Sequence, residues 1–195
     1  MSESDRLHWE KITRELVTLK NTSEMMMDLA YSALLLNNNY LAEEVMTLEE
    51  RMDNLHIDFQ TEVLSRTDEE TDPKQLLGII RMGNVTERIA DAANEIAEVV
   101  LRGGEPHPIL GMVIQDAEET VEHVIIGENS VVAGKTLREA EIAEETGMWV
   151  LYIRRGNRWM RPRPSTRLEP GDLVVASGYS EGEDDFKQLL SGEKD

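Results

Sequence analysis

Two pairs of carboxylates in the first half of the chain have a spacing that suits a cation. Glu49 and Asp53 form one pair, Glu87 and Asp91 form the other, and each pair reads as E-x-x-x-D. On a helix this spacing puts both carboxylates on one face, where their like charges repel. If the two helices are neighbours, a divalent or iron-type cation bound between them would offset the repulsion. The pattern therefore predicts a metal site, and a solvated acidic face is the alternative.

A group of arginines in the second half is a local positive exception in an acidic chain. It consists of Arg154, Arg155, Arg158, Arg161, Arg163 and Arg167. Guanidinium groups bind phosphates and carboxylates through paired hydrogen bonds. The group therefore has two interpretations. It binds an anionic ligand such as a nucleotide phosphate, or it pairs with acids of the same chain or of a dimer partner.

Several enzyme motifs are absent or incomplete. Gly134-Lys135-Thr136 resembles the end of a phosphate-binding loop, but Asn129 stands where that loop needs its first glycine. The chain has no G-x-G-x-x-G, no G-x-S-x-G and no cysteine. Its four histidines, His8, His56, His107 and His123, are scattered. We therefore expect a protein that is not an enzyme.

The carboxylate pairs must be positioned by helices, and residues 1–104 predict three of them. The first runs from about Asp5 to Leu36, the second follows Asn37–Asn39, and the third runs from about Pro73 to Arg102 after a break at Thr67–Thr71. Asp72 suits the N-cap of the third helix and Pro73 its first turn. Long helices joined by short turns pack antiparallel, so we predict a three-helix bundle.

Apolar residues three and four positions apart predict the buried face of each helix. The predicted faces are Ile12, Leu16, Leu19, Met26, Ala30 and Ala33; Leu41, Val45, Leu48, Met52, Leu55, Phe59 and Val63; and Leu76, Ile80, Gly83, Ile89, Ala93, Ile96 and Val100. A bundle this thin leaves apolar surface uncovered, and a homodimer would bury it.

Residues 105–195 predict a second, mixed domain, because Gly103-Gly104 and Pro106-x-Pro108 stop the third helix. The expected elements are a short helix at Pro108–Ala117, a strand at Glu122–Ile126, a helix at Thr136–Thr146, strands at Trp149–Arg154, Arg158–Arg161 and Leu173–Ser177, and a helix at Asp184–Leu190. The predicted fold class is α + α/β: an antiparallel three-helix bundle followed by a small β-α-β-β-β-α domain.

Charge and composition limit the partners. The formal net charge is −19, which repels nucleic acid phosphates and anionic lipid surfaces, so we expect no nucleic acid partner. Hydrophobic residues make up 40% of the chain, enough for a core. The N-terminal residues lack the pattern of a secretion signal, and the apolar stretches are shorter than a membrane span. Together with the missing cysteines, these features favour a cytoplasmic protein.

The segment Glu87–Glu98, ERIADAANEIAE, resembles the third-helix signature of PhoU-type helical domains. Leu48–Leu55, which contains Glu49 and Asp53, resembles the second-helix segment of the same family. The resemblance covers most of residues 8–103 and corresponds to one three-helix repeat. It implies that the faces formed by Glu49, Asp53, Glu87 and Asp91 can carry metal. It also implies that a homodimer would restore the two-repeat arrangement of the full-length phosphate regulators.

Residues 109–191 resemble the TrkA C-terminal domain, also called the RCK C-terminal domain. The carrying segments are Val124–Ile126, Ser130–Leu137, Gly147–Gly156 and Leu168–Gly178. The resemblance implies a dimer that binds a small effector in its cleft, with Val131, Ile142, Arg154 and Arg155 as the ligand-binding residues. Some relatives bind a cyclic dinucleotide through a base on the helix before the second strand. The segment Glu141–Gly147 is acidic and has no base, which argues against cyclic di-AMP.

The two resemblances together imply a cytosolic regulator of cation transport, with potassium as the cation. Its partner would be a membrane channel or transporter subunit, and its effector is not identified by any residue pattern. The alternative is a metal-binding, PhoU-like signalling module linked to phosphate control. In that case the C-terminal domain serves as a dimeriser.

Overall fold

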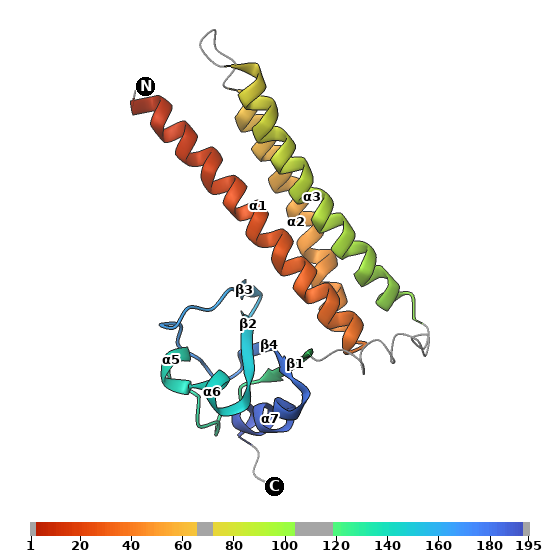
Figure 1. Ribbon diagram of the computed structural model, residues 1–195, viewed down its shortest axis with the longest axis vertical. Helices are drawn as coiled ribbons and strands as arrows, with labels where there is room; N and C mark the ends of the chain where they lie inside the picture. The colour runs from red at the N-terminus through yellow and green to blue at the C-terminus, as the bar shows by residue number, and fades with distance from the viewer. Residues whose placement is uncertain (1–2, 66–71, 104–118, 193–195) are drawn as a thin grey trace. The chain divides into compact units, whose positions relative to one another are not determined.

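The computed structural model describes residues 3–65, 72–103 and 119–192 (Figure 1). The chain divides into two compact units, Met1–Glu105 and Pro106–Asp195. Within the described ranges, no helix is both long enough and apolar enough to cross a bilayer.

The first unit is the predicted bundle of three long helices. They are α1 (Glu3–Leu35), α2 (Asn39–Leu64) and α3 (Pro73–Leu101), and each packs against the other two. Side-chain caps begin two of them: Asn38 accepts a hydrogen bond from the Leu41 backbone at 3.1 Å, and Asp72 accepts one from Lys74 at 2.9 Å. Pro73 follows Asp72 in the first turn of α3, so the predicted start of this helix is confirmed.

The core of the bundle follows the predicted faces of α1 and α2 closely. Ile12, Leu19, Met26, Ala30 and Ala33 are buried on α1. On α2, the buried members of the predicted seam are Leu41, Val45, Leu48, Met52, Phe59 and Val63. Leu16 and Leu55 are half-buried. These two helices therefore enclose the core with large side chains.

The predicted buried face of α3 is partly wrong. Ile89 is 41% exposed, and Ile80 and Ile96 are only half-buried. The face that packs against α1 and α2 is instead Leu76, Gly83, Ala90, Ala93, Ala97 and Val100. The physical reason is close approach: a Cβ added at Gly83 would lie 2.5 Å from the Phe59 ring, so this face of α3 needs small residues.

The second unit is a four-stranded antiparallel sheet covered by short helices (Figure 1). Its strands are β1 (Glu119–Ile125), β2 (Met148–Arg155), β3 (Arg158–Met160) and β4 (Leu173–Tyr179), in the spatial order β1-β4-β2-β3. The short 3-10 helix η1 (Ser180–Gly182) leads into α7 (Glu183–Ser191), whose Phe186 and Leu190 join Ile153, Val174 and Ala176 in the core. The predicted order of strands and helices is confirmed.

The helix predicted at Thr136–Thr146 is two short helices, α5 (Leu137–Ala140) and α6 (Ile142–Thr146). Glu141 separates them in the left-handed conformation, with φ of 47°. Ala140 and Ile142 are both buried, and two residues that far apart do not share a face on a continuous helix. The break lets both side chains reach the core. The helix predicted at Pro108–Ala117 and the break at Thr67–Thr71 lie outside the described residues.

Candidate functional site

A groove of about 410 Å³ lies beside the start of β2. Its lining residues are Leu137, Arg138, Ile142, Ala143, Glu144, Trp149, Val150 and Pro164. The side chain of Trp149 is 54% exposed, which leaves much of the indole accessible to a ligand. An exposed aromatic ring of this kind stacks well on a planar ligand such as a nucleotide base.

The groove also contains one cation, the exposed Arg138, and one anion, Glu144. Arg138 lies in the first turn of α5, and a capping box fixes the start of that helix. The Thr136 hydroxyl accepts from the Glu139 backbone at 3.3 Å, and the Thr136 backbone donates to the Glu139 carboxylate at 2.8 Å. A guanidinium beside an indole suits a ligand that joins a flat ring to a phosphate.

A second groove, of about 500 Å³, lies between the turn before α5 and helix α7. Its lining residues are Asn129, Val131, Glu145, Thr146, Asp185, Gln188, Leu189 and Gly192. Val131 is exposed there, and the charged side chains of the lining are the two carboxylates of Glu145 and Asp185. This groove therefore repels the anionic ligand that the first groove suits.

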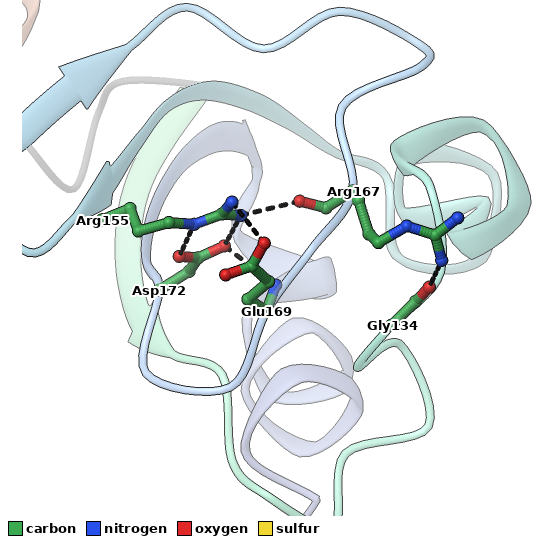
Figure 2. A network of polar contacts seen from close by, with 5 residues as sticks. All are labelled: Gly134, Arg155, Arg167, Glu169 and Asp172. Atoms are coloured by element: carbon green, nitrogen blue, oxygen red, sulfur yellow. Dashed lines mark hydrogen bonds and ion pairs between the residues drawn. The ribbon is translucent and has the colours of Figure 1, made fainter.

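Arg155 belongs to a polar network that closes the loop before β4 (Figure 2). Its Nε donates to Oδ1 of Asp172 at 2.8 Å, and its Nη2 donates to Oδ2 of Asp172 at 2.7 Å and to the Arg167 carbonyl at 2.8 Å. Glu169 pairs with Nη1 of the same guanidinium, and Arg167 in turn donates to the Gly134 carbonyl. Asp172 is buried, so this ion pair stabilises the domain itself.

The acidic pairs of the bundle converge across α2 and α3. Burial raises the pKa of the Glu49 carboxyl, and the charges of Asp53, Asp91 and Glu87 raise it further. Burial also raises the pKa of Glu87, with added effects from Asp91 and Asp53, while His56 acts in the opposite direction. The structure therefore brings the four predicted residues within electrostatic range of one another. Among the described residues, no three Asp, Glu or His side chains form a group that could hold a metal ion as they stand.

Two domain families match the chain. The model of the PhoU domain matches residues 16–100, and the model of the TrkA-C domain matches residues 121–191. The chain joins a PhoU domain to a TrkA-C domain. The acidic pairs lie in the PhoU domain, and both grooves lie in the TrkA-C domain.

Three solved structures are among those similar to parts of this chain. The RCK C domain of the potassium transport protein KtrA, in complex with cyclic di-AMP, is 22% identical, with a TM-score of 0.34, and the match covers 42% of this chain and 94% of that one. The GsuK channel bound to NAD is 18% identical, with a TM-score of 0.35 and coverages of 60% and 21%. Streptococcal BusR (S. agalactiae) with its busA promoter DNA is 16% identical, with a TM-score of 0.36 and coverages of 73% and 67%. No curated protein matches the chain.

The TrkA-C domain does not bring the four predicted ligand residues together. Val131 lines the second groove, and Ile142 borders the first with its side chain turned into the core. Arg155 pairs with acids of its own domain, which is the second interpretation of the arginine group. Arg154, on the same strand, lines neither groove and is half-buried.

Sequence reasoning missed Arg138 and Trp149 as candidate ligand residues. The segment Glu141–Gly147 has no basic residue, but Arg138, three residues before it on α5, supplies one to the groove. The signal that could have revealed it is the T-x-x-E capping pattern at Thr136, which starts a short helix and puts Arg138 in its first turn.

Proposed function

We propose that this protein is a cytoplasmic, non-enzymatic regulator of potassium transport whose TrkA-C domain binds a small anionic effector. Its partner would be a membrane channel or transporter subunit, and the working form would be a homodimer. TrkA-C domains regulate ion transport, which supports the transport role. The net charge of −19 argues against a nucleic acid partner.

The groove beside β2 is the observation that carries this proposal. It combines the exposed indole of Trp149 with the guanidinium of Arg138 over an apolar base that includes Leu137 and Val150. Together they match the two parts of a nucleotide, a flat base and a phosphate. We therefore assign the effector to the nucleotides, including the cyclic dinucleotides.

An effector of this kind regulates by changing the population of dimer geometries. It must bind one arrangement of the two copies better than another, because equal affinity for both shifts nothing. The PhoU domain would then transmit the change or contact the transporter. This role requires no chemical step.

Replacing Trp149 by alanine tests the effector assignment. We expect the affinity for the bound nucleotide to fall about 10- to 100-fold, because stacking contributes about 1–3 kcal/mol per base. Isothermal titration calorimetry with AMP, ATP and cyclic di-AMP measures the loss. Tyr179→Ala is the matched control, since Tyr179 is 55% exposed on the same domain but lines neither groove. The assignment is wrong if none of the three nucleotides binds, or if the control loses as much affinity.

The second candidate function is a metal-binding signalling module linked to phosphate control, with the TrkA-C domain as dimeriser. The raised pKa values of Glu49 and Glu87 favour it. Burial is the main cause of both shifts, and the charges of carboxylates on the two helices add to it. A divalent or iron-type cation held by Glu49, Asp53, Glu87 and Asp91 would relieve the repulsion between these carboxylates once their side chains move together.

The pH dependence of the bundle tests this second candidate. Because the pKa values of Glu49 and Glu87 are raised by folding, the folded chain holds these protons more tightly than the unfolded chain. Stability therefore falls as the pH rises from the ordinary carboxyl range through the raised pKa values. We expect the Tm of the helical signal in circular dichroism to fall accordingly without metal. The Glu49→Gln/Glu87→Gln variant should show a smaller fall.

Added Mn²⁺, Fe²⁺ or Zn²⁺ at neutral pH should reverse the fall in the unmodified chain. At 100 times its Kd, a bound ion raises the Tm of a domain of this size by roughly 10–20 °C. The Glu49→Gln/Glu87→Gln variant should lose this response, whereas Glu43→Gln, on the exposed face of α2, should keep it. An equal response in both variants would rule out the four carboxylates as the metal site.

A further inference from the structure

Helix α3 carries a second apolar stripe, which the rest of the bundle leaves largely exposed. Its members alternate four and three residues apart along the helix: Gly78, Met82, Val85, Ile89, Ala92, Ile96 and Val99. Met82 is 60% exposed, Val85 56% and Val99 57%, although each is a large apolar side chain. We call this stripe the outer seam.

The outer seam is distinct from the face of α3 that packs inside the bundle. That inner face contains Gly83, Ala90 and Ala97, each one residue after Met82, Ile89 and Ile96 of the outer seam. A helix with one apolar stripe lies at the edge of a bundle, whereas a helix with two stripes has neighbours on two sides. A spacing of four and three is also the repeat by which two helices pack knobs into holes.

We infer that the outer seam of α3 pairs antiparallel with the outer seam of a second copy of this chain. The pairing is centred between Ile89 and Ala92. The surface is thus a self-complementary interface between PhoU domains. It goes beyond the proposed effector site, because it requires no ligand and lies in the other domain.

The sizes of the side chains favour this pairing. In an antiparallel arrangement about the midpoint of Met82–Val99, each large residue faces a smaller one. Met82 lies opposite Val99 of the second copy, Ile89 opposite its Ala92, and Ile96 opposite its Val85. Large residues opposite small ones fill the space between two helices without overlap. A parallel pairing would instead put Ile89 against Ile89 and leave Ala92 against Ala92.

The charges beside the seam favour the same arrangement. Arg88 and Glu95 flank the outer seam on one side, both are exposed, and neither has an ion-pair partner among the described residues. In the antiparallel pairing Arg88 of each copy lies level with Ala93 of the other, and Glu95 is about 3 Å further along the helix, within reach of the arginine side chain. The twofold axis makes two such pairs. Such opposite charges at the rim select the partner and its orientation. The two Arg88–Glu95 pairs favour a second copy as the occupant of this surface.

Cysteine cross-linking in the full chain tests the pairing, since the chain has no cysteine of its own. In Ala92→Cys the two thiols lie near the twofold axis, so a short bismaleimide should join two chains. In Gln75→Cys the thiols of an antiparallel pair lie about 45 Å apart along the helices, so the same reagent should not join them. Equal cross-linking at both positions would overturn the antiparallel arrangement. No cross-linking at Ala92→Cys would overturn the interface.

Two sets of substitutions in the Ala92→Cys chain distinguish pairing through the outer seam from nonspecific hydrophobic association. Val85→Glu/Val99→Glu should abolish cross-linking, whereas Ile57→Glu/Leu64→Glu, at exposed apolar positions of α2, should leave it intact.

Arg88→Glu should weaken the dimer about tenfold, and Arg88→Glu/Glu95→Arg should restore it, because the pairs are re-formed with reversed sign. Circular dichroism verifies that each variant keeps its helices. Failure of the reversed pair to restore cross-linking would overturn the register.

Discussion

Replacing Asp172 by alanine should lower the free energy of unfolding of the TrkA-C domain by about 3 kcal/mol. The Asp172 side chain is 1% exposed and accepts two hydrogen bonds from the Arg155 guanidinium. It also accepts one from the Glu169 backbone at 2.9 Å. Alanine leaves these donors without their acceptor and the guanidinium without its buried counter-charge. The cost stays below that of a fully buried pair because Arg155 reaches solvent.

Urea unfolding followed by tryptophan fluorescence measures this loss. A Trp9→Phe background leaves Trp149 and Trp159, which both lie in the TrkA-C domain, as the reporters. Glu169→Ala is the matched control: it removes a carboxylate from the same guanidinium, but one whose side chain is 50% exposed. We expect it to cost under about 1 kcal/mol, as surface pairs do. Equal losses in the two variants would show that burial of Asp172 is not the source of the stability.

Replacing Phe59 by alanine should lower the free energy of unfolding of the PhoU domain by about 3–5 kcal/mol. Phe59 is fully buried on α2, and its ring occupies the space above Gly83 of α3. Removing the ring takes away a large buried apolar surface. It also leaves a cavity between helices whose backbones are already close, so the bundle closes it only in part.

The helical signal in circular dichroism during urea unfolding measures the effect of Phe59→Ala. Ile57→Ala, at an exposed position of the same helix, should change stability by under about 0.5 kcal/mol. Gly83→Ala alone should cost about 1–3 kcal/mol because its Cβ would overlap the ring. In Phe59→Ala/Gly83→Ala the overlap is gone, so the combined loss should be smaller than the sum. Additive losses would contradict the contact between the two residues.

The helices of the bundle were predictable because their signals are local. Asp72 and Pro73 mark the start of α3, and the apolar spacing on α1 and α2 identifies the buried side chains. The inner face of α3 was not predictable in this way. The apolar residues of this helix form two stripes, and most of the larger side chains belong to the exposed stripe. The size of Ile89 suggested that it would be buried. The close approach of Phe59 instead requires small residues such as Gly83 and Ala90 on the buried face.

The candidate groove was less predictable for a related reason. The order of the strands follows from the sequence pattern, but Arg138 and Trp149 become neighbours only when the chain breaks at Glu141 and turns onto β2. The ion pair of Arg155 was hard to predict for the same reason. Its partner Asp172 lies seventeen residues later, and the buried pair exists only once β2 and β4 lie side by side. The residue types indicated which chemistry was possible. Packing between distant parts of the chain determined which side chains come into contact.

The order of strands in the sheet also affects when each domain can fold during synthesis. β1 is an edge strand whose neighbour is β4, so residues 119–125 find their strand partner only when residues 173–179 have been synthesised. The PhoU domain, by contrast, has its last helix complete at Leu101. Because domains fold as units, the N-terminal one first during synthesis, the helical domain should mature first as the chain emerges from the ribosome. A nascent chain would thus carry a finished PhoU domain while β1 of its TrkA-C domain still lacked its partner strand.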